Sequence, residues 1–190
     1  GFGIDAVVDY VDLLVANCKM TGFALCVQLT QFRQNDNQVI RGLSVVNNSF
    51  TGAENYSLFA GSEDLTINGN ILEDSQTTHI CRVWQAYKGV VSHNKISGAN
   101  LGNSNGRHGL KFHGPAENLI GDFATTGAGG IEKRTKYAVI ANNVNGGCGP
   151  WPFAIGPSSN SSDERVTDVL VEKNKIISDY GLQNTIADTG

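Results

Sequence analysis

One spacing recurs along this chain and constrains its fold more than any other feature. Two residues that are apolar or glycine lie two positions apart, an asparagine follows three positions later, and another apolar residue stands two positions beyond it. Four segments keep these offsets: residues 43–50, 65–72, 89–96 and 169–176. The first three asparagines, Asn48, Asn70 and Asn94, are 22 and 24 residues apart. Repeats of this length that contain short strands indicate a solenoid.

Each copy of the spacing predicts a strand, a bend and a second strand. The first two apolar residues face the same side, because side chains alternate along a strand. The asparagine falls at the bend, and asparagine tolerates the left-handed backbone conformation that sharp bends need. We therefore expect Asn48, Asn70, Asn94 and Asn174 to take that conformation and to form a ladder of hydrogen-bonded amides from one repeat to the next.

Two weaker copies extend the pattern. In one, Cys18 takes the asparagine position, with Leu13, Val15 and Met20 at the apolar positions. In the other, around Asn143, the last apolar position slips to Val144.

Two further segments are assigned by comparison with these copies. Residues 4–20 also fit a helical stripe, so an N-terminal capping helix is the alternative to strands there. Ile131 precedes Ala138 by seven positions, as Leu58 precedes Leu65. We therefore expect residues 131–134 to supply the same strand in a shortened repeat, and residues 151–155 to supply its last copy.

This repeat resembles that of the right-handed parallel β-helix superfamily of pectate-lyase-like proteins, over nearly the whole chain. The resemblance implies an all-β solenoid of about seven coils that forms one domain over residues 1–190. Because terminal coils expose unpaired strand edges, we expect a fragment or module of a larger chain, or a homo-oligomer, that covers its ends.

Composition limits the classes of function. The net charge is −4 and the 14 lysines and arginines are scattered, so no nucleic-acid footprint is predicted. No apolar run approaches the length of a membrane span, and the first residues lack the pattern of a signal peptide. Metal-binding spacing is missing from the four cysteines, Cys18, Cys26, Cys81 and Cys148. Free buried thiols are favoured there, with disulfides as the alternative.

The superfamily resemblance implies that a substrate binds outside the coil, along one sheet, and that it is a polysaccharide. Residues 107–115 hold the best local candidates. If Leu110 and Phe112 face the core, Lys111 and His113 project outward on one face, about 7 Å apart.

A lyase resembling the alginate and chondroitin lyases of this fold needs a base to remove a proton beside a uronate carboxylate, and positive charge to stabilise the enolate. Lys111 or His113 is the predicted base. Arg82 and Arg134 are predicted to neutralise the carboxylate, for which arginine has the bidentate geometry.

The remaining predicted substrate-binding residues are Trp84 and Trp151, which would stack on sugar rings, together with His79 and Lys133. The acidic pairs at 63–64 and 73–74 are candidate Ca²⁺ ligands at bends, and the cofactor is otherwise unknown. An inverting hydrolase needs two carboxyl groups about 6.5–9.5 Å apart, whereas this face shows mostly basic residues.

The sequence thus predicts an extracellular or cell-surface protein that recognises an acidic or neutral polysaccharide, with a polysaccharide lyase as the enzymatic form. The alternative is a non-catalytic structural or adhesive module of a fibre, spike or surface layer. Charge geometry separates the two hypotheses. The enzyme requires Arg82, Lys111, His113 and Arg134 to converge in one groove, whereas the structural module leaves them dispersed.

Overall fold

The computed structural model describes residues 2–6, 10–29, 40–99, 108–113, 135–148, 152–156, 166–177 and 186–188. All regular elements in these ranges are β-strands, and their pairings are parallel. The predicted all-β class is therefore confirmed. Among the same residues, no helix is long and apolar enough to cross a membrane.

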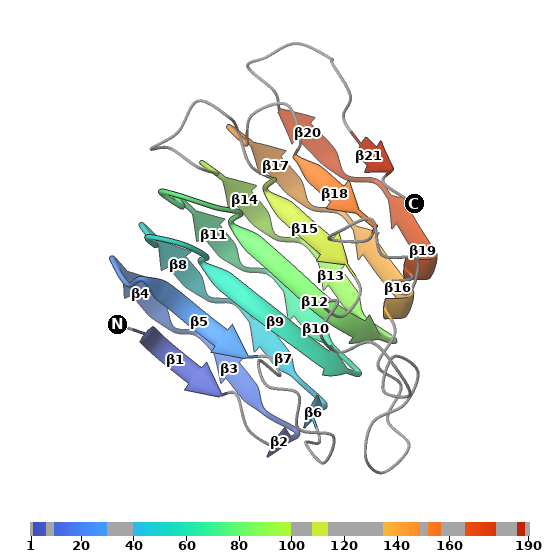
Figure 1. The fold of residues 1–190 in the computed structure, drawn as a ribbon, viewed down its shortest axis with the longest axis horizontal. Coiled ribbons are helices and arrows are strands. Elements are labelled where there is room, and N and C mark those ends of the chain that lie inside the picture. Colours follow the sequence, from blue (N-terminus) through green and yellow to red (C-terminus); the bar gives the residue numbers. More distant parts are fainter. Residues whose placement is uncertain are drawn as a thin grey trace.

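The strands form three faces, which successive repeats visit in the same order (Figure 1). Face A comprises β1 (Phe2–Ala6), β5 (Leu25–Leu29), β9 (Leu58–Glu63), β12 (Cys81–Tyr87), β15 (Leu110–His113), β18 (Phe153–Ile155) and β21 (Ile186–Asp188). Face B comprises β3 (Leu14–Ala16), β7 (Ser44–Val46), β10 (Thr66–Asn68), β13 (Val90–Ser92), β16 (Thr135–Ala141) and β19 (Val166–Glu172). Face C comprises β4 (Lys19–Thr21), β8 (Ser49–Thr51), β11 (Ile71–Glu73), β14 (Lys95–Ser97), β17 (Val144–Gly146) and β20 (Lys175–Ile177).

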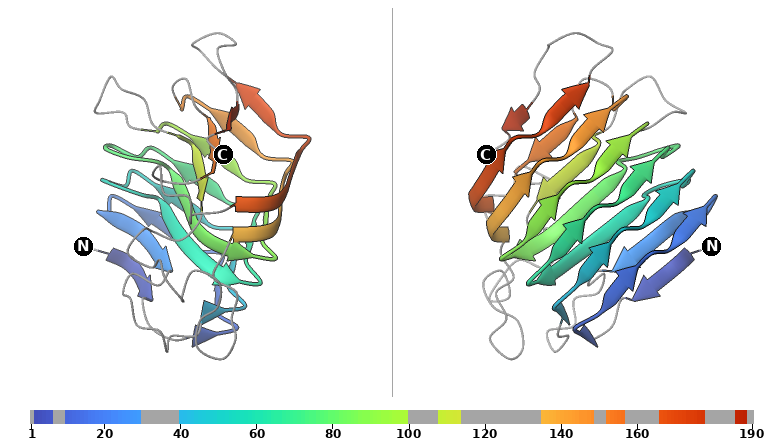
Figure 2. Two further views of the ribbon diagram at one scale, coloured as in Figure 1. Left: turned by 45° about the vertical axis from the view of Figure 1, so that its right-hand side comes forward. Right: turned by 180° about the vertical axis from the view of Figure 1, so that it is seen from behind.

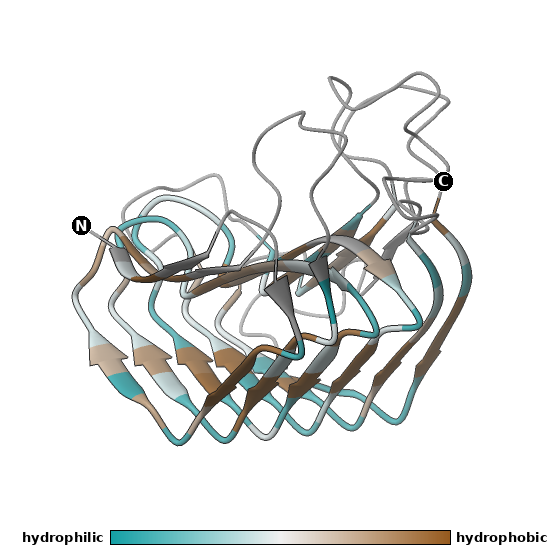
Figure 3. Cartoon of the chain, turned by 90° about the horizontal axis from the view of Figure 1, so that it is seen from below, coloured by the Kyte–Doolittle hydropathy of each residue, from teal (hydrophilic) through white to brown (hydrophobic). Residues whose placement is uncertain are grey.

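Faces A and B belong to one 15-stranded sheet, which also contains the short strands β2 (Tyr10–Val11) and β6 (Ile40–Arg41), and face C is a separate six-stranded sheet. Corresponding strands of neighbouring repeats pair in register, as Val45, Ile67 and Val91 do on face B. Figure 2 shows these strands from behind as parallel rows, and Figure 3 shows the chain bending between faces at mainly hydrophilic positions. The arrangement is compatible with the predicted parallel β-helix.

Left-handed residues mark the bends at five-residue intervals. In the third repeat they are Asp64, Gly69 and Asp74, with φ of 55°, 68° and 60°. The same three bends occur in the other repeats at residues 12, 17 and 22, at 42, 47 and 52, at 88, 93 and 98, and at 137, 142 and 147. Most of these positions hold Asn, Asp or Gly, the residues that enter this conformation at least cost.

The asparagine ladder is confirmed, but the expected backbone conformation of its members is wrong. Asn70 Oδ1 accepts hydrogen bonds from Asn48 N at 2.9 Å and from Asn48 Nδ2 at 3.0 Å, and Asn94 repeats both contacts with Asn70. The left-handed residue precedes each ladder asparagine, as Asn47 precedes Asn48 and His93 precedes Asn94. The preceding residue turns the chain, and the ladder side chain then points inward, where Asn48, Asn70, Asn94 and Asn143 are buried.

The predicted apolar positions form the core, with one correction in the fifth repeat. Leu43, Val45 and Phe50 are each 0% exposed. The expected slip to Val144 does not occur: Asn145 pairs with Ile96 on one side and Ile176 on the other, and it is fully buried. Pairing with both neighbouring strands holds the register, and Asn145 Nδ2 donates to the Pro152 carbonyl oxygen at 3.1 Å.

Two other expectations are corrected by the strand positions. The N-terminal helix alternative is wrong, because β1 to β4 lie in residues 2–21. Residues 131–134 lie outside the described residues, and the face A position predicted for them is filled by β15, which pairs with β12 and β18.

Candidate functional site

Strand alternation on face A orients the predicted residues. Cys81 and Val83 on β12, like Leu110 and Phe112 on β15, are each 0% exposed and belong to the core. The residue between each pair, Arg82 or Lys111, therefore points out of the core. Backbone register places Phe59, Arg82 and Lys111 opposite one another on three neighbouring strands. Two of the predicted cationic residues thus lie side by side.

Several contacts fix the Arg82 guanidinium. Its Nε donates to His113 Nε2 at 2.8 Å, and its Nη1 donates to the Tyr56 hydroxyl at 2.9 Å. Its central carbon lies 5.1 Å from the centroid of the Phe59 ring and 5.6 Å from that of Tyr56. Arginine commonly packs on aromatic faces in this way. The charge is therefore held in one orientation by groups from β9, the residues just before β9, and β15.

His113 is close to Arg82, as predicted, but its predicted exposure is wrong. The side chain is 0% exposed. Its Nε2 accepts the proton of Arg82 Nε, so in the neutral ring this hydrogen-bond network assigns the proton to Nδ1. The lone pair of Nε2 is occupied, which leaves Lys111 as the better placed of the two predicted bases.

The surrounding backbone is tied down at the end of β15. Thr135 Oγ1 donates to the His113 carbonyl oxygen at 2.8 Å and accepts from Ala86 N at 3.1 Å. Ala86 follows a register shift in β12 that starts at Val83, and such bulges redirect side chains beside functional sites. The threonine thus joins the bulge of β12 to the strand that carries Lys111 and His113.

An aromatic column lies next to these charges. Tyr56, His79 and His108 each stand two residues before the first core residue of their face A strand. The His79 and His108 rings stack with centroids 4.8 Å apart at 15°, and Tyr56 lies 6.2 Å from His79. The His108 backbone N–H donates to His79 Nδ1 at 3.1 Å. A half-buried row of rings therefore runs across the strands.

Sequence reasoning selected His79 but missed Tyr56, Phe59 and His108. For Tyr56 and His108, the missed signal is their offset from the first core residue of each strand, which becomes visible only when Leu58, Cys81 and Leu110 are aligned.

The described residues do not test the placement of the other predicted side chains. Trp84 lies on β12 opposite His113 in the backbone register. Arg134, Lys133 and Trp151 lie outside the described residues. Trp151 stands two residues before Phe153, the offset of the aromatic column.

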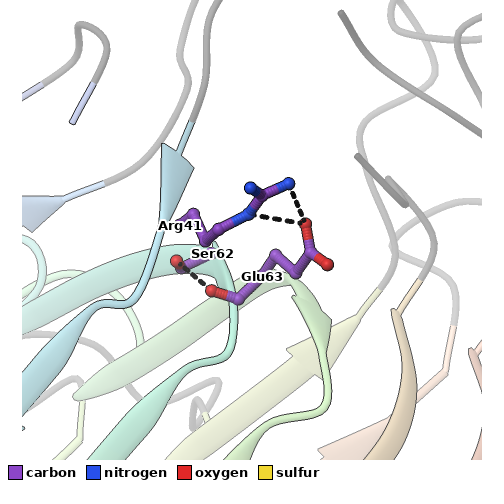
Figure 4. A network of polar contacts seen from close by, with 3 residues as sticks. All are labelled: Arg41, Ser62 and Glu63. Atoms are coloured by element: carbon purple, nitrogen blue, oxygen red, sulfur yellow. Dashed lines mark hydrogen bonds and ion pairs between the residues drawn. The ribbon is translucent and has the colours of Figure 1, made fainter. Parts of the chain in front are cut away.

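The two glutamates among the proposed calcium ligands have other partners. Glu63 Oε2 lies 3.2 Å from Arg41 Nη2 (Figure 4). Glu73 Oε1 lies 2.6 Å from Lys95 Nζ and accepts from Ser97 Oγ at 3.1 Å. The Lys95 hydrogen bond holds the pKa of Glu73 below its ordinary value. No group of three or more His, Cys, Asp or Glu that could hold a metal gathers among the described residues.

The four cysteines are free thiols, as favoured from the sequence. Cys26, Cys81 and Cys148 are buried, and Cys18 is half-buried. Burial raises the pKa of Cys81 to about 12 and that of Cys148 to about 11. Thiols in this state are structural rather than nucleophilic.

No family, no curated protein and no solved structure matches this chain. A fixed guanidinium, a neighbouring lysine and a row of rings can bind an anionic group and stack on the rings that carry it.

Proposed function

We propose that face A recognises an acidic polysaccharide outside the cell or at its surface. The observation that carries the proposal is the Arg82 guanidinium, held by His113 and Tyr56 beside the aromatic column. A fixed guanidinium favours a carboxylate because little side-chain freedom is lost on binding. Sugar rings present apolar faces that pack on aromatic side chains.

An extended polymer suits this surface better than a small molecule. The aromatic column crosses three neighbouring repeats and the Arg82–Lys111 row crosses two, and neighbouring strands are about 4.8 Å apart. Successive sugars of a chain lying along the stack of repeats would then meet equivalent positions on successive strands. We further infer that the repeats wind as a right-handed parallel β-helix, since parallel crossover connections are right-handed in about 98% of cases.

The enzymatic form of this proposal is β-elimination. Lys111, as the free amine, takes the proton from the carbon that bears the uronate carboxylate, and Arg82 stabilises the resulting enolate. A carbon–carbon double bond forms as the bond to the glycosidic oxygen breaks, and the leaving oxygen takes up a proton. The reaction needs no redox partner and yields an unsaturated uronate that absorbs ultraviolet light.

Lys111→Arg tests the lysine directly. Arginine keeps the positive charge but stays protonated, with a pKa above about 12, so the variant is expected to bind polymer and to form no unsaturated product. Lys19→Arg is the matched control, because Lys19 is an exposed lysine on β4 of face C. Ultraviolet absorbance is followed with alginate, pectate and glycosaminoglycans. An unchanged rate in Lys111→Arg would remove Lys111 from the mechanism, and a flat trace for the wild type would leave recognition without cleavage.

One observation favours the structural module instead. In the sixth repeat, Val169, Val171 and Ile176 are only partly buried, although their counterparts in the second to fifth repeats are buried. A cavity of about 160 Å³ is lined there by Phe153, Val171, Glu172, Lys173, Asn174 and Ile176. Burying these apolar side chains against a further coil or a second copy of the chain would remove apolar surface from water and so stabilise the contact. Sedimentation measures whether the protein self-associates. Self-association that is lost in Val171→Lys would support the structural module. A wild type that stays monomeric at all concentrations would argue against it.

A further inference from the structure

We propose that face B is a contact surface for a second copy of this chain, with the two sheets facing each other and each repeat opposite the same repeat of the other copy. The inference concerns another face of the coil, so it does not rest on the function proposed for face A. Three features of the face B strands carry it.

The first feature is the lack of charge on the outer side of face B. Side chains alternate between the core and the outside along each strand, so two side chains of each strand point outward between the bends. They are Leu14 and Ala16, Ser44 and Val46, Thr66 and Asn68, Val90 and Ser92, Val139 and Ala141, and Leu170 and Glu172. Glu172 is the only charged residue among these twelve. Leu14, Val90 and Leu170 are 63%, 39% and 52% exposed, so an apolar surface lies open to solvent.

Face C shows that this lack of charge is not a general property of the coil. Its strands alternate in the same way, but their outward positions include four charged residues. These are Lys19, Glu73, Lys95 and Lys175. Charged residues are depleted at the centre of protein–protein interfaces. Face B therefore has the composition of a contact surface, and face C that of a solvated one.

The second feature is that face B complements itself in side-chain size. A two-fold axis along the stack of repeats makes the facing strands antiparallel, and it sets the first outward residue of each strand against the second one of the same repeat. Four repeats then place a larger side chain opposite a smaller one: Leu14 and Ala16, Ser44 and Val46, Val90 and Ser92, and Val139 and Ala141. Sheets about 10 Å apart pack well when large and small side chains interdigitate. In the third repeat, Thr66 meets Asn68, and the two polar side chains can form a hydrogen bond.

The third feature is the charge along the rim of face B. The same axis sets the bend before each strand against the bend after it, so Asp168 meets the oppositely charged Lys173. With His93 neutral, none of the six facing pairs of bends combines like charges. A two-fold axis along the strands would instead put the first repeat opposite the sixth and set Asp12 against Asp168. Like charges at an interface are unfavourable, so the axis along the stack is preferred.

The size of face B sets the strength of the contact. Six strands about 4.8 Å apart, each five residues wide at about 3.3 Å per residue, cover about 500 Å² in each copy. A total near about 1,000 Å² falls at the lower end of specific interfaces. We therefore expect a weak dimer, with a dissociation constant of about 10 μM.

Sedimentation of the full chain tests the interface. The wild type should be monomeric well below about 10 μM and dimeric well above it. Val90→Lys should abolish the dimer, because the contact would take an unpaired ammonium group out of water. Ile71→Lys is the matched control, since Ile71 is 42% exposed on face C and Val90 is 39% exposed on face B. Circular dichroism checks that both variants fold, and Thr66→Lys in the same row replaces Val90→Lys if that variant does not.

Oxidative cross-linking tests which residues face each other. A mixture of Ser44→Cys and Val46→Cys should form a covalent dimer faster than either variant alone. In the proposed arrangement these two positions are directly opposite, whereas identical residues are offset by about 7 Å along the strand. The wild type under the same conditions measures any cross-linking through its own thiols, of which Cys18 is half-buried.

Each outcome decides the proposal. A wild type that stays monomeric well above about 10 μM would overturn it, and so would a dimer that survives in Val90→Lys or is lost equally in Ile71→Lys. A dimer that is lost in Val171→Lys and kept in Val90→Lys would place the contact at the sixth repeat instead. A mixture that cross-links no faster than the single variants would refute the pairing of equal repeats. Polysaccharide binding by face A can succeed or fail without changing any of these results.

Discussion

Removal of one ladder amide should destabilise the protein far more than its size suggests. Asn70 is 1% exposed, and its side chain makes four hydrogen bonds: two from Asn48, one to the Val45 carbonyl oxygen at 2.8 Å and one to Asn94 Oδ1 at 2.9 Å. At about 1 kcal/mol each, the loss of all four in Asn70→Ala amounts to about 4 kcal/mol. A typical domain has a total stability of about 5–15 kcal/mol.

The position within the ladder sets the size of the effect. Asn174, in the sixth repeat, is half-buried and makes three side-chain hydrogen bonds. At the same value for each bond, Asn174→Ala should therefore cost about 3 kcal/mol. Asn47 is exposed at a bend with φ of 56°. Asn47→Gly suits that conformation and should change the stability by less than about 1 kcal/mol.

Urea unfolding followed by circular dichroism gives the free energy of unfolding of each variant. The account requires Asn70→Ala to be the least stable, Asn174→Ala intermediate and Asn47→Gly nearest the wild type. A loss below about 1 kcal/mol for Asn70→Ala, or a loss equal to that of Asn47→Gly, would refute the reasoning from net hydrogen-bond energies.

Three further predictions concern bends, thiols and pH. Lys173 has φ of 53°, so Lys173→Gly should raise the midpoint of urea unfolding. Lys175→Gly, within strand β20, should lower the midpoint. A shift of the midpoint in the same direction for both variants would contradict the idea that Lys173 is strained. Because burial raises the pKa of Cys81 to about 12, a thiol reagent at neutral pH should modify Cys18 alone in the native protein and all four cysteines in urea; rapid native labelling of Cys81 would oppose this. The lowered pKa of Glu73 stabilises the fold above the ordinary glutamate pKa of about 4.3, and this contribution is lost as the pH falls through the lower folded value. Glu73→Gln should therefore lose less stability on acidification, and parallel curves for variant and wild type would disprove the linkage.

The repeat allowed much of the architecture to be predicted, because an inward-facing residue has the same surroundings in every repeat. Leu43, Val45 and Phe50 are buried as their spacing predicts. The position of the left-handed residue was missed, because Asn stands at both Asn47 and Asn48 and composition does not say which one bends the chain.

Residues that break the repeat were harder to place. Asn145 is polar at an apolar position, and only its pairing with Ile96 and Ile176 shows that it stays inside. On the outside, alternation predicted that Arg82 and Lys111 leave the core on the same face. It did not predict that His113 would be 0% exposed, since burial of an outward side chain depends on what packs over it rather than on its own strand.

The central claim, that face A binds an acidic polysaccharide through Arg82, is tested most directly by equilibrium binding of a uronate polymer and of its carboxyl-reduced form. The account predicts binding of the charged polymer, loss of binding after reduction, and a weakening of about tenfold in Arg82→Lys, which keeps the charge but lacks the planar fork. Equal affinity for the two polymers, or for Arg82→Lys and the wild type, would contradict it.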